Sequence, residues 1–168
     1  ENDLLDAYDF FVITRSDYIY TLPHPDFDVL SSDFIYIPEG EHYGGVTDRH
    51  VVLPRQFVTT YLNVLEKMLL SAQGYYPKLL ERHEINIEQL IHFHLIQQNV
   101  ACKIKFFPYV MYTVRSDKDP TRNSGGKFVS ELGYFVKYAS EYSQANSHKQ
   151  EFENGGESLS DYYKERIY

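Results

Sequence analysis

The strongest constraint on the fold is an apolar run near the start of the chain that ends in opposite charges. Residues 8–14 read YDFFVIT, and the next three residues are Arg15, Ser16 and Asp17. A segment that is apolar at nearly every position is typical of a β-strand covered on both faces, as in α/β sheets. We therefore expect a core strand that is followed directly by a charged pair.

Further apolar runs predict the other strands and helices, separated by loops that contain Pro and Gly. Short strands are predicted at three places: Phe34–Ile37, Cys102–Phe107 and Val110–Val114. Helices are predicted where apolar residues recur at a spacing of three to four: 54–73, 86–99 and 128–145. Gly74 is the predicted end of the first helix, and Asn86 the predicted N-cap of the second. This pattern predicts an α/β fold with a mixed sheet flanked by helices.

A polar segment divides the chain. Residues 117–127 read DKDPTRNSGGK, a composition typical of a loop. We interpret residues 1–115 as a core, residues 116–127 as a mobile loop or lid, and residues 128–168 as a helical tail or linker. The final segment, DYYKERIY, is predicted to be either a packed terminal helix or part of a linker to another domain.

The composition excludes several classes of partner. The 168 residues carry a net charge of −8, and no cluster of Lys and Arg forms a basic patch, so a nucleic-acid partner is not expected. No apolar run approaches the roughly 20 residues of a membrane-spanning helix. Cys102 is the only cysteine, so the fold has no internal disulfide, which favours a reducing, cytoplasmic location. Because the chain begins with Glu1 rather than Met, we expect a trimmed piece of a longer parent that carries further domains.

Arg15 and Asp17 form the first candidate site. Ligands of α/β sheets bind at the carboxyl ends of strands, because the loops diverge there and leave a crevice. A carboxylate in that position can hold a divalent cation, which in turn binds a diphosphate. The alternative is an ion pair between Arg15 and Asp17, since residues two apart lie on the same side of an extended strand.

The loop at 38–50, PEGEHYGGVTDRH, is the second candidate site. Its ionisable side chains are Glu39, Glu41, His42, Asp48, Arg49 and His50. Gly44 and Gly45 permit a positive φ or the close approach of a ligand to the backbone. The alternative is a solvated loop in which Thr47 or Asp48 caps the next helix.

The helix at 86–99 is the third candidate site. Glu88 and His92 are four residues apart and share a face of the helix. His92 and His94 do not share a face, so they do not form a two-histidine metal site. The alternative gives these histidines ordinary roles at the surface and at the edge of the core.

Taken in order, these segments resemble a group of GT-A type glycosyltransferases from viruses, bacteria and plants. That group carries an Arg-(Pro/Ser)-Asp motif, then Tyr-Gly-Gly-X-(Asn/Thr)-Asp-Arg, then a Glu-led helix and a strand that ends in Arg. The matching segments are YDFFVITRSDYIY, YGGVTDRHVV and the stretch from Glu84 to Arg115, so the resemblance covers roughly residues 8–115.

The resemblance implies an enzyme of glycan biosynthesis that moves a sugar from a UDP- or GDP-linked donor to a glycan or other hydroxyl acceptor. Asp17 is then implied to be a ligand of Mn²⁺ or Mg²⁺, which stabilises the leaving nucleotide. Arg15 is implied to contact the phosphates or to orient Asp17. Residues 1–115 become the metal and acceptor side of the catalytic core.

Other roles implied by the resemblance fall on the second and third candidate sites. Gly44, Gly45 and Asp48 would line the donor-sugar or acceptor pocket, with Arg49 supporting them. If the enzyme inverts, Glu88 is implied to be the base that deprotonates the acceptor hydroxyl. Asp48 is the second implied catalytic residue.

The sequence departs from the GT-A pattern in two ways. The motif at residues 15–17 is Arg-Ser-Asp rather than Asp-X-Asp, so one metal carboxylate is absent. The nucleotide-binding half that precedes this motif in GT-A enzymes is also expected to lie outside the chain. These departures support an alternative function as a catalytically silent module that binds glycans or docks another domain. A metal-dependent hydrolase that uses Asp17 and Asp48 is a further alternative.

Overall fold

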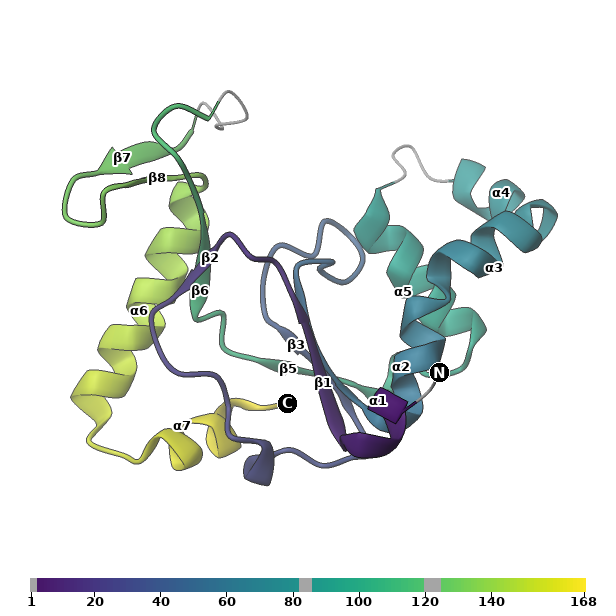
Figure 1. Cartoon of the computed structure of the whole chain (residues 1–168), viewed down its shortest axis with the longest axis horizontal. Helices are drawn as coiled ribbons and strands as arrows, with labels where there is room; N and C mark the ends of the chain where they lie inside the picture. The colour runs from purple at the N-terminus through teal and green to yellow at the C-terminus, as the bar shows by residue number, and fades with distance from the viewer. Residues whose placement is uncertain (1–2, 82–85, 120–124) are drawn as a thin grey trace. The chain divides into compact units, whose positions relative to one another are not determined.

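The structure is a computed structural model that describes residues 3–81, 86–119 and 125–168. It divides into two compact units (Figure 1). Unit 1 contains residues 1–14 and 31–106, and unit 2 contains residues 15–30 and 107–168. The predicted boundary between the core and the loop, after residue 115, therefore falls inside unit 2. Arg15 and Asp17 also belong to unit 2, while the strand before them belongs to unit 1.

The sheet of unit 1 has four strands in the order β1-β4-β3-β5. Their bounds are β1 (Phe10–Thr14), β4 (His50–Pro54), β3 (Ile35–Pro38) and β5 (Ile104–Phe107). β4 pairs antiparallel with both β1 and β3. The predicted α/β class, with a mixed sheet flanked by helices, is confirmed, whereas GT-A membership stays a prediction.

Burial differs sharply between the central and edge strands. Every residue of β3 and β4 is buried. β1 is an edge strand with one neighbour, and Val12 in its middle is 42% exposed. The strand predicted from residues 8–14 is therefore present, but the prediction that it is covered on both faces was wrong. The central strand β4 was not predicted, because His50 and Pro54 flank only three apolar residues.

The helices of unit 1 are α1 (Asp3–Ala7), α2 (Arg55–Leu62), α3 (Val64–Leu70), α4 (Ala72–Leu80) and α5 (Ile87–Gln97). Buried residues of α2, α3 and α5 form the core with β3 and β4. Asn86 caps α5 as predicted, since its Oδ1 accepts a hydrogen bond from the Gln89 N–H at 2.8 Å. The single helix predicted at 54–73 is wrong: breaks at Asn63 and Ser71 give three helices, and Gly74 lies inside α4.

The segment that leads into β5 also differs from the prediction. Residues Ala101–Lys103 form a 3-10 turn, and the strand begins at Ile104 rather than at Cys102. Cys102 is exposed, and not buried inside a strand as its apolar neighbours indicated.

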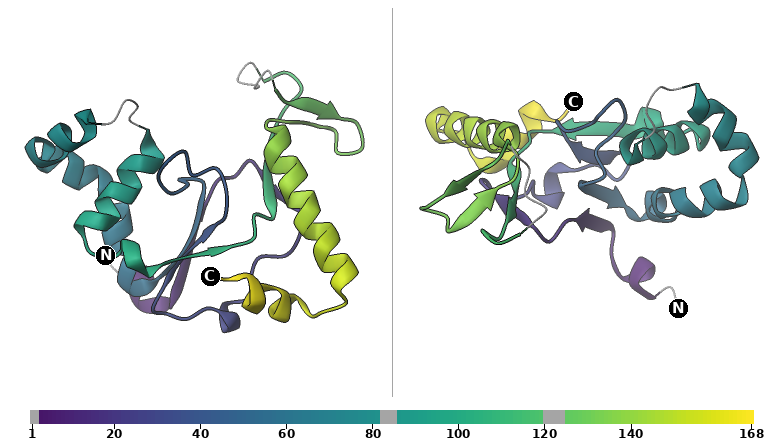
Figure 2. Two further views of the ribbon diagram at one scale, coloured as in Figure 1. Left: turned by 180° about the vertical axis from the view of Figure 1, so that it is seen from behind. Right: turned by 90° about the horizontal axis from the view of Figure 1, so that it is seen from above.

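The sheet of unit 2 has four strands in the order β2-β6-β8-β7. Their bounds are β2 (Tyr18–Tyr20), β6 (Met111–Arg115), β8 (Tyr134–Val136) and β7 (Lys127–Val129). The pairs β2–β6, β6–β8 and β7–β8 are all antiparallel. Helix α6 (Ala139–Gly155) runs along β6 (Figure 2), where it shares a core formed by Tyr112, Val136 and Ala145. The register of these pairs sets the site described below.

The C-terminal part of unit 2 differs from a second prediction. The helix expected at 128–145 is wrong, because this stretch contains the β7–β8 hairpin and only then the start of α6. Gly133 lies between the two strands with a φ of 70°, a turn conformation that suits glycine. The final segment is the packed helix α7 (Leu159–Arg166), in which Tyr162 and Tyr163 are 0% exposed.

Two further expectations, the lid and the lack of a membrane-spanning helix, can be compared with the described residues only. Residues 120–124 of the predicted lid at 116–127 lie outside the described residues. Within the described ranges, the structure contains no helix with the length and apolar character needed to cross a membrane.

Candidate functional site

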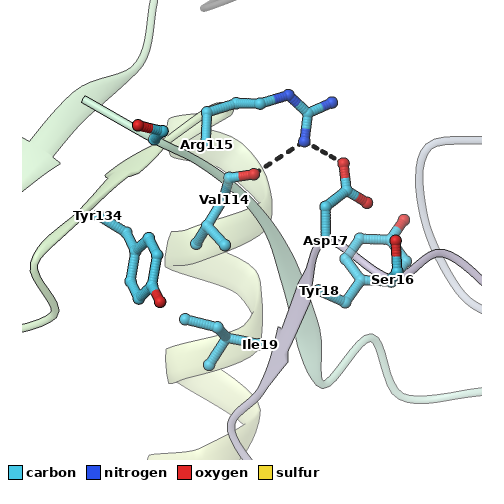
Figure 3. A pocket seen from close by; sticks show the side chains of 8 residues that line it. Ser16, Asp17, Tyr18, Ile19, Val114, Arg115 and Tyr134 are labelled. Atoms are coloured by element: carbon cyan, nitrogen blue, oxygen red, sulfur yellow. Dashed lines mark hydrogen bonds and ion pairs between the residues drawn. The ribbon is translucent and has the colours of Figure 1, made fainter. Parts of the chain in front are cut away.

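A pocket of about 330 Å³ lies in unit 2, where β2 begins and β6 ends (Figure 3). Its lining residues are Ser16, Asp17, Tyr18, Ile19, Val114, Arg115, Ser116 and Tyr134. The Val114 N–H donates to the Asp17 carbonyl at 2.9 Å, so Asp17 extends the antiparallel pairing of β2 with β6. Arg115 pairs with Phe135, which brings Tyr134 of β8 to the same end of the sheet.

Asp17 is hydrogen-bonded to two guanidinium groups. Arg15 donates from Nε to Oδ1 at 2.9 Å and from Nη2 to Oδ2 at 2.8 Å, in a bidentate arrangement. Arg115 donates from Nη1 to the same Oδ2. The pKa of Asp17 lies well below its usual range, mainly because Arg15 donates hydrogen bonds to the carboxylate. The hydrogen bond from Arg115 and the positive charges of both arginines lower this pKa further, while burial opposes them. Asp17 is therefore a carboxylate at neutral pH.

Arg115 keeps donors that no described residue uses. Its side chain is only 13% exposed. Nη1 donates to Asp17 and to the Val114 carbonyl at 2.8 Å, and Nε lies 3.7 Å from Oδ2 of Asp119. Nη2 has no acceptor among the described residues, and Figure 3 shows it directed away from Asp17 and Val114. A guanidinium has five N–H donors in a planar fork, so this group can still bind an anion.

The predicted metal site at Asp17 can be tested against the ligands that are present. Mg²⁺ and Mn²⁺ prefer several oxygen ligands. Both oxygens of Asp17 already accept guanidinium hydrogen bonds. Among the described ranges, no three His, Cys, Asp or Glu side chains gather closely enough to hold an ion. The described residues therefore do not fit a divalent cation, and the alternative ion pair between Arg15 and Asp17 is present.

Arg115 was missed as a site residue in the sequence analysis. It lies 98 positions from Asp17, and nothing local connects the two. One signal pointed to it: the resemblance includes a strand that ends in Arg after the Glu-led helix. The antiparallel register of β2 and β6 turns that position into a neighbour of Asp17.

A second cluster lies in unit 1, in the loop between β3 and β4. Glu41 and Tyr43 have φ values of 54° and 46°, a left-handed conformation that costs about 1–3 kcal/mol for each residue other than glycine. The side chains of Asn86 and Gln89 in the start of α5 hold this loop, donating to the Tyr43 carbonyl at 3.0 and 3.3 Å. Arg49 is 7% exposed and pairs with Glu41 at 3.6 Å.

Gly44 and Gly45 of this loop are required for different structural reasons. Gly44 has a φ of 79°, which favours glycine. At Gly45 an added Cβ would lie 2.1 Å from the Glu88 carbonyl oxygen, so only glycine lets the loop pack on the first turn of α5. The Val46 N–H donates to that same carbonyl at 3.1 Å. The close approach that was predicted for a ligand is made at Gly45 by the backbone of α5.

The predicted residues fall into two groups, one in each unit. Gly44, Gly45, Asp48, Arg49 and Glu88 belong to unit 1, while Arg15 and Asp17 belong to unit 2. Within unit 1, Asp48 is exposed and Glu88 is 8% exposed. Glu41 and Tyr43, which contact Arg49 there, were not predicted as its partners.

No protein-family model matches the chain, and searches of curated proteins and of solved structures find no match either.

Proposed function

We propose that this chain is part of a glycosyltransferase, and that the pocket of unit 2 binds the diphosphate of a nucleotide-sugar donor. One observation carries the proposal: Arg115 lines this pocket with a nearly buried guanidinium, and no described residue accepts a hydrogen bond from its Nη2. Guanidinium groups match the geometry of phosphate oxygens, and bonds between ionised partners are among the strongest hydrogen bonds in proteins. The resemblance of residues 8–115 to GT-A enzymes supports the same class.

In the proposed reaction, negative charge develops on the diphosphate that the guanidinium groups bind. The bond between the anomeric carbon of the sugar and a diphosphate oxygen breaks, and its electron pair leaves with that oxygen. The oxygen of the acceptor hydroxyl forms the new bond to the same carbon, and its proton passes to a base. Because negative charge grows on the departing diphosphate, donors that are already held in place stabilise the transition state more than the bound substrate. The acceptor class is a glycan or another hydroxyl compound.

A second candidate function is the binding of a sugar without catalysis. The lining of the pocket favours it, because the charges of Arg115 and Asp17 balance each other. Ser16 and Ser116 add hydroxyl groups, and Tyr134 adds an aromatic face. Such a set suits a neutral, hydroxyl-rich ligand, which needs paired donors and acceptors together with an apolar wall.

The release of nucleoside diphosphate from a panel of UDP- and GDP-linked sugars tests the proposal, with and without short oligosaccharide acceptors. We expect the wild-type chain to release nucleotide from at least one donor, and Arg115→Gln to lose at least about 90% of that rate, since one oriented charge donor is typically worth a factor of 100 or more. Arg55→Gln is the matched control, because Arg55 pairs with exposed Asp9 at 3.0 Å in unit 1. Release that Arg115→Gln leaves intact would contradict the proposal, and sugar binding without release would favour the second candidate.

A further inference from the structure

We infer that Asp17 is a positioning residue, which holds Arg15 and Arg115 for a diphosphate at a site that works without a divalent cation. The inference deepens the proposed function and rests on it. It replaces the metal ligand implied by the resemblance with a second role for the same carboxylate. Arg115 touches the diphosphate in this account, and Asp17 acts through it.

The hydrogen bonds of Asp17 support the positioning role. Its carboxylate receives both arms of the Arg15 fork and one N–H of Arg115. Arg15 precedes β2 and Arg115 ends β6, so one side chain ties together groups from two neighbouring strands. Two guanidinium groups repel each other, and the carboxylate between them offsets that repulsion. Without Asp17, the two positive groups would therefore separate.

The carbonyl of Val114 fixes the second contact of the same guanidinium. Arg115 Nη1 donates to this carbonyl and to Asp17, which together set the plane of the fork. With Nη1 bound in this way and no described residue at Nη2, this second nitrogen is the part of the fork that can bind a ligand. The side chain is largely buried, so it loses little freedom when an anion binds.

The same contacts oppose a cation. To bind Mn²⁺ or Mg²⁺, Asp17 has to release hydrogen bonds from Arg15 or Arg115. The ion would then lie beside two positive side chains, where like charges disfavour it. A diphosphate meets the opposite situation, because the guanidinium groups attract it.

The inference is tested on the whole chain by titration calorimetry with inorganic pyrophosphate and with UDP, in buffer that contains EDTA. Mn²⁺ alone is titrated separately and followed by electron paramagnetic resonance. We expect pyrophosphate to bind in EDTA, and Arg115→Gln to weaken its affinity at least ten-fold. Asp17→Asn should weaken it several-fold, and the double variant should bind no worse than Arg115→Gln alone, because Asp17 acts through Arg115. Asp9→Asn, the matched control, should leave the affinity unchanged, since Asp9 pairs with Arg55 outside the pocket.

Two results would overturn the inference in different ways. If UDP binds only with Mn²⁺, and Asp17→Asn abolishes a bound Mn²⁺ signal, then Asp17 is a metal ligand and the proposed donor site survives without the positioning role. If neither pyrophosphate nor UDP binds with or without Mn²⁺, the proposed function fails as well. If Asp17→Asn does not fold, pyrophosphate binding by the wild-type chain in EDTA and in Mn²⁺ tests the inference instead. Arg115→Lys is measured beside it: this variant keeps the charge but loses the fork, and it should bind pyrophosphate more weakly than wild type.

Discussion

Arg115 and Asp17 lie 98 positions apart in the sequence and are joined by a hydrogen bond from Nη1 to Oδ2. The antiparallel pairing of β2 with β6 creates this contact, because it places the residue before one strand beside the end of the other. Arg15 completes the cluster with two hydrogen bonds to the same carboxylate. The charged pair that follows the first apolar strand is thus one part of a three-residue site.

Asp17 should contribute to stability in a manner that depends on pH. Its pKa is lowered in the folded chain, mainly by the Arg15 hydrogen bonds, so its contribution is present above the unfolded pKa of about 3.9 and is lost as the pH falls toward the folded value. Asp17→Asn should lower the free energy of unfolding by about 1–2 kcal/mol at pH 7. Urea unfolding at several pH values measures this difference, which should shrink below about pH 4.

The exposed pair Arg55–Asp9 provides the control for that experiment. The Asp9 side chain is 87% exposed, so Asp9→Asn should change the free energy of unfolding by less than about 0.5 kcal/mol at any pH. A wild-type advantage over Asp17→Asn that persists unchanged to pH 2.5 would contradict the lowered pKa.

Gly45 should tolerate no side chain. Gly45→Ala places a Cβ at 2.1 Å from the backbone oxygen of Glu88, so the loop and α5 have to separate. We expect a loss of about 1–3 kcal/mol in the free energy of unfolding, as for other overpacked sites. Gly74→Ala is the matched control: it lies in α4 with nothing within 4 Å of the new Cβ, and it should gain about 0.5–1 kcal/mol. Thermal or urea unfolding of both variants checks the opposite signs.

The features that were predicted correctly have local signals. Asn86 caps α5 through the residue three positions later, and the apolar runs at β1 and β3 are continuous. The ion pair of Arg15 with Asp17 spans two residues and was foreseen as an alternative. Contacts of this range follow from periodicity and side-chain chemistry alone.

The features that were missed depend on partners far away in the sequence. β4 is short and is flanked by His50 and Pro54, and its central place follows from pairing with two other strands. The segment at 128–145 has apolar spacing compatible with a helix, but the pairing of β8 with β6 overrides that preference. The role of Arg115 depends on the same sheet, so no local pattern reveals it.

Tyr134 should contribute to the binding of a nucleoside but not of a bare diphosphate. Its ring lines the pocket and is 47% exposed, so a base can stack on it. Stacking on an aromatic side chain is worth about 1–3 kcal/mol per base, so Tyr134→Ala should weaken UDP binding about ten-fold and leave pyrophosphate binding unchanged.

Phe128 of the same hairpin is the control for Tyr134. It is 49% exposed but does not line the pocket, so Phe128→Ala should leave both affinities unchanged. Tyr134→Phe should keep the UDP affinity, because the ring and not the hydroxyl provides the stacking surface. Equal losses of affinity for UDP and for pyrophosphate in Tyr134→Ala would contradict the stacking role, because they would show that the variant disturbs the whole pocket.

Asp48 and Glu88, the predicted catalytic residues, should differ in their effects on stability. Asp48 is exposed, whereas Glu88 is 8% exposed in the first turn of α5. Asp48→Asn should therefore change the free energy of unfolding by less than about 0.5 kcal/mol. Glu88→Gln should lower it by up to about 1 kcal/mol, because the helix start loses a negative charge. Urea unfolding of both variants measures these changes, and a larger loss in Asp48→Asn than in Glu88→Gln would contradict the expected order.

The most direct test of the account is the side-chain ¹⁵N NMR signal of Arg115 during a titration of the whole chain with pyrophosphate in EDTA. The signal is identified by its absence in Arg115→Gln. Because Nη2 of Arg115 is the proposed donor, its resonance should shift and saturate along the same curve as the calorimetric binding. Binding that saturates while the Arg115 resonance stays in place, or no binding until Mn²⁺ is added, would contradict the account.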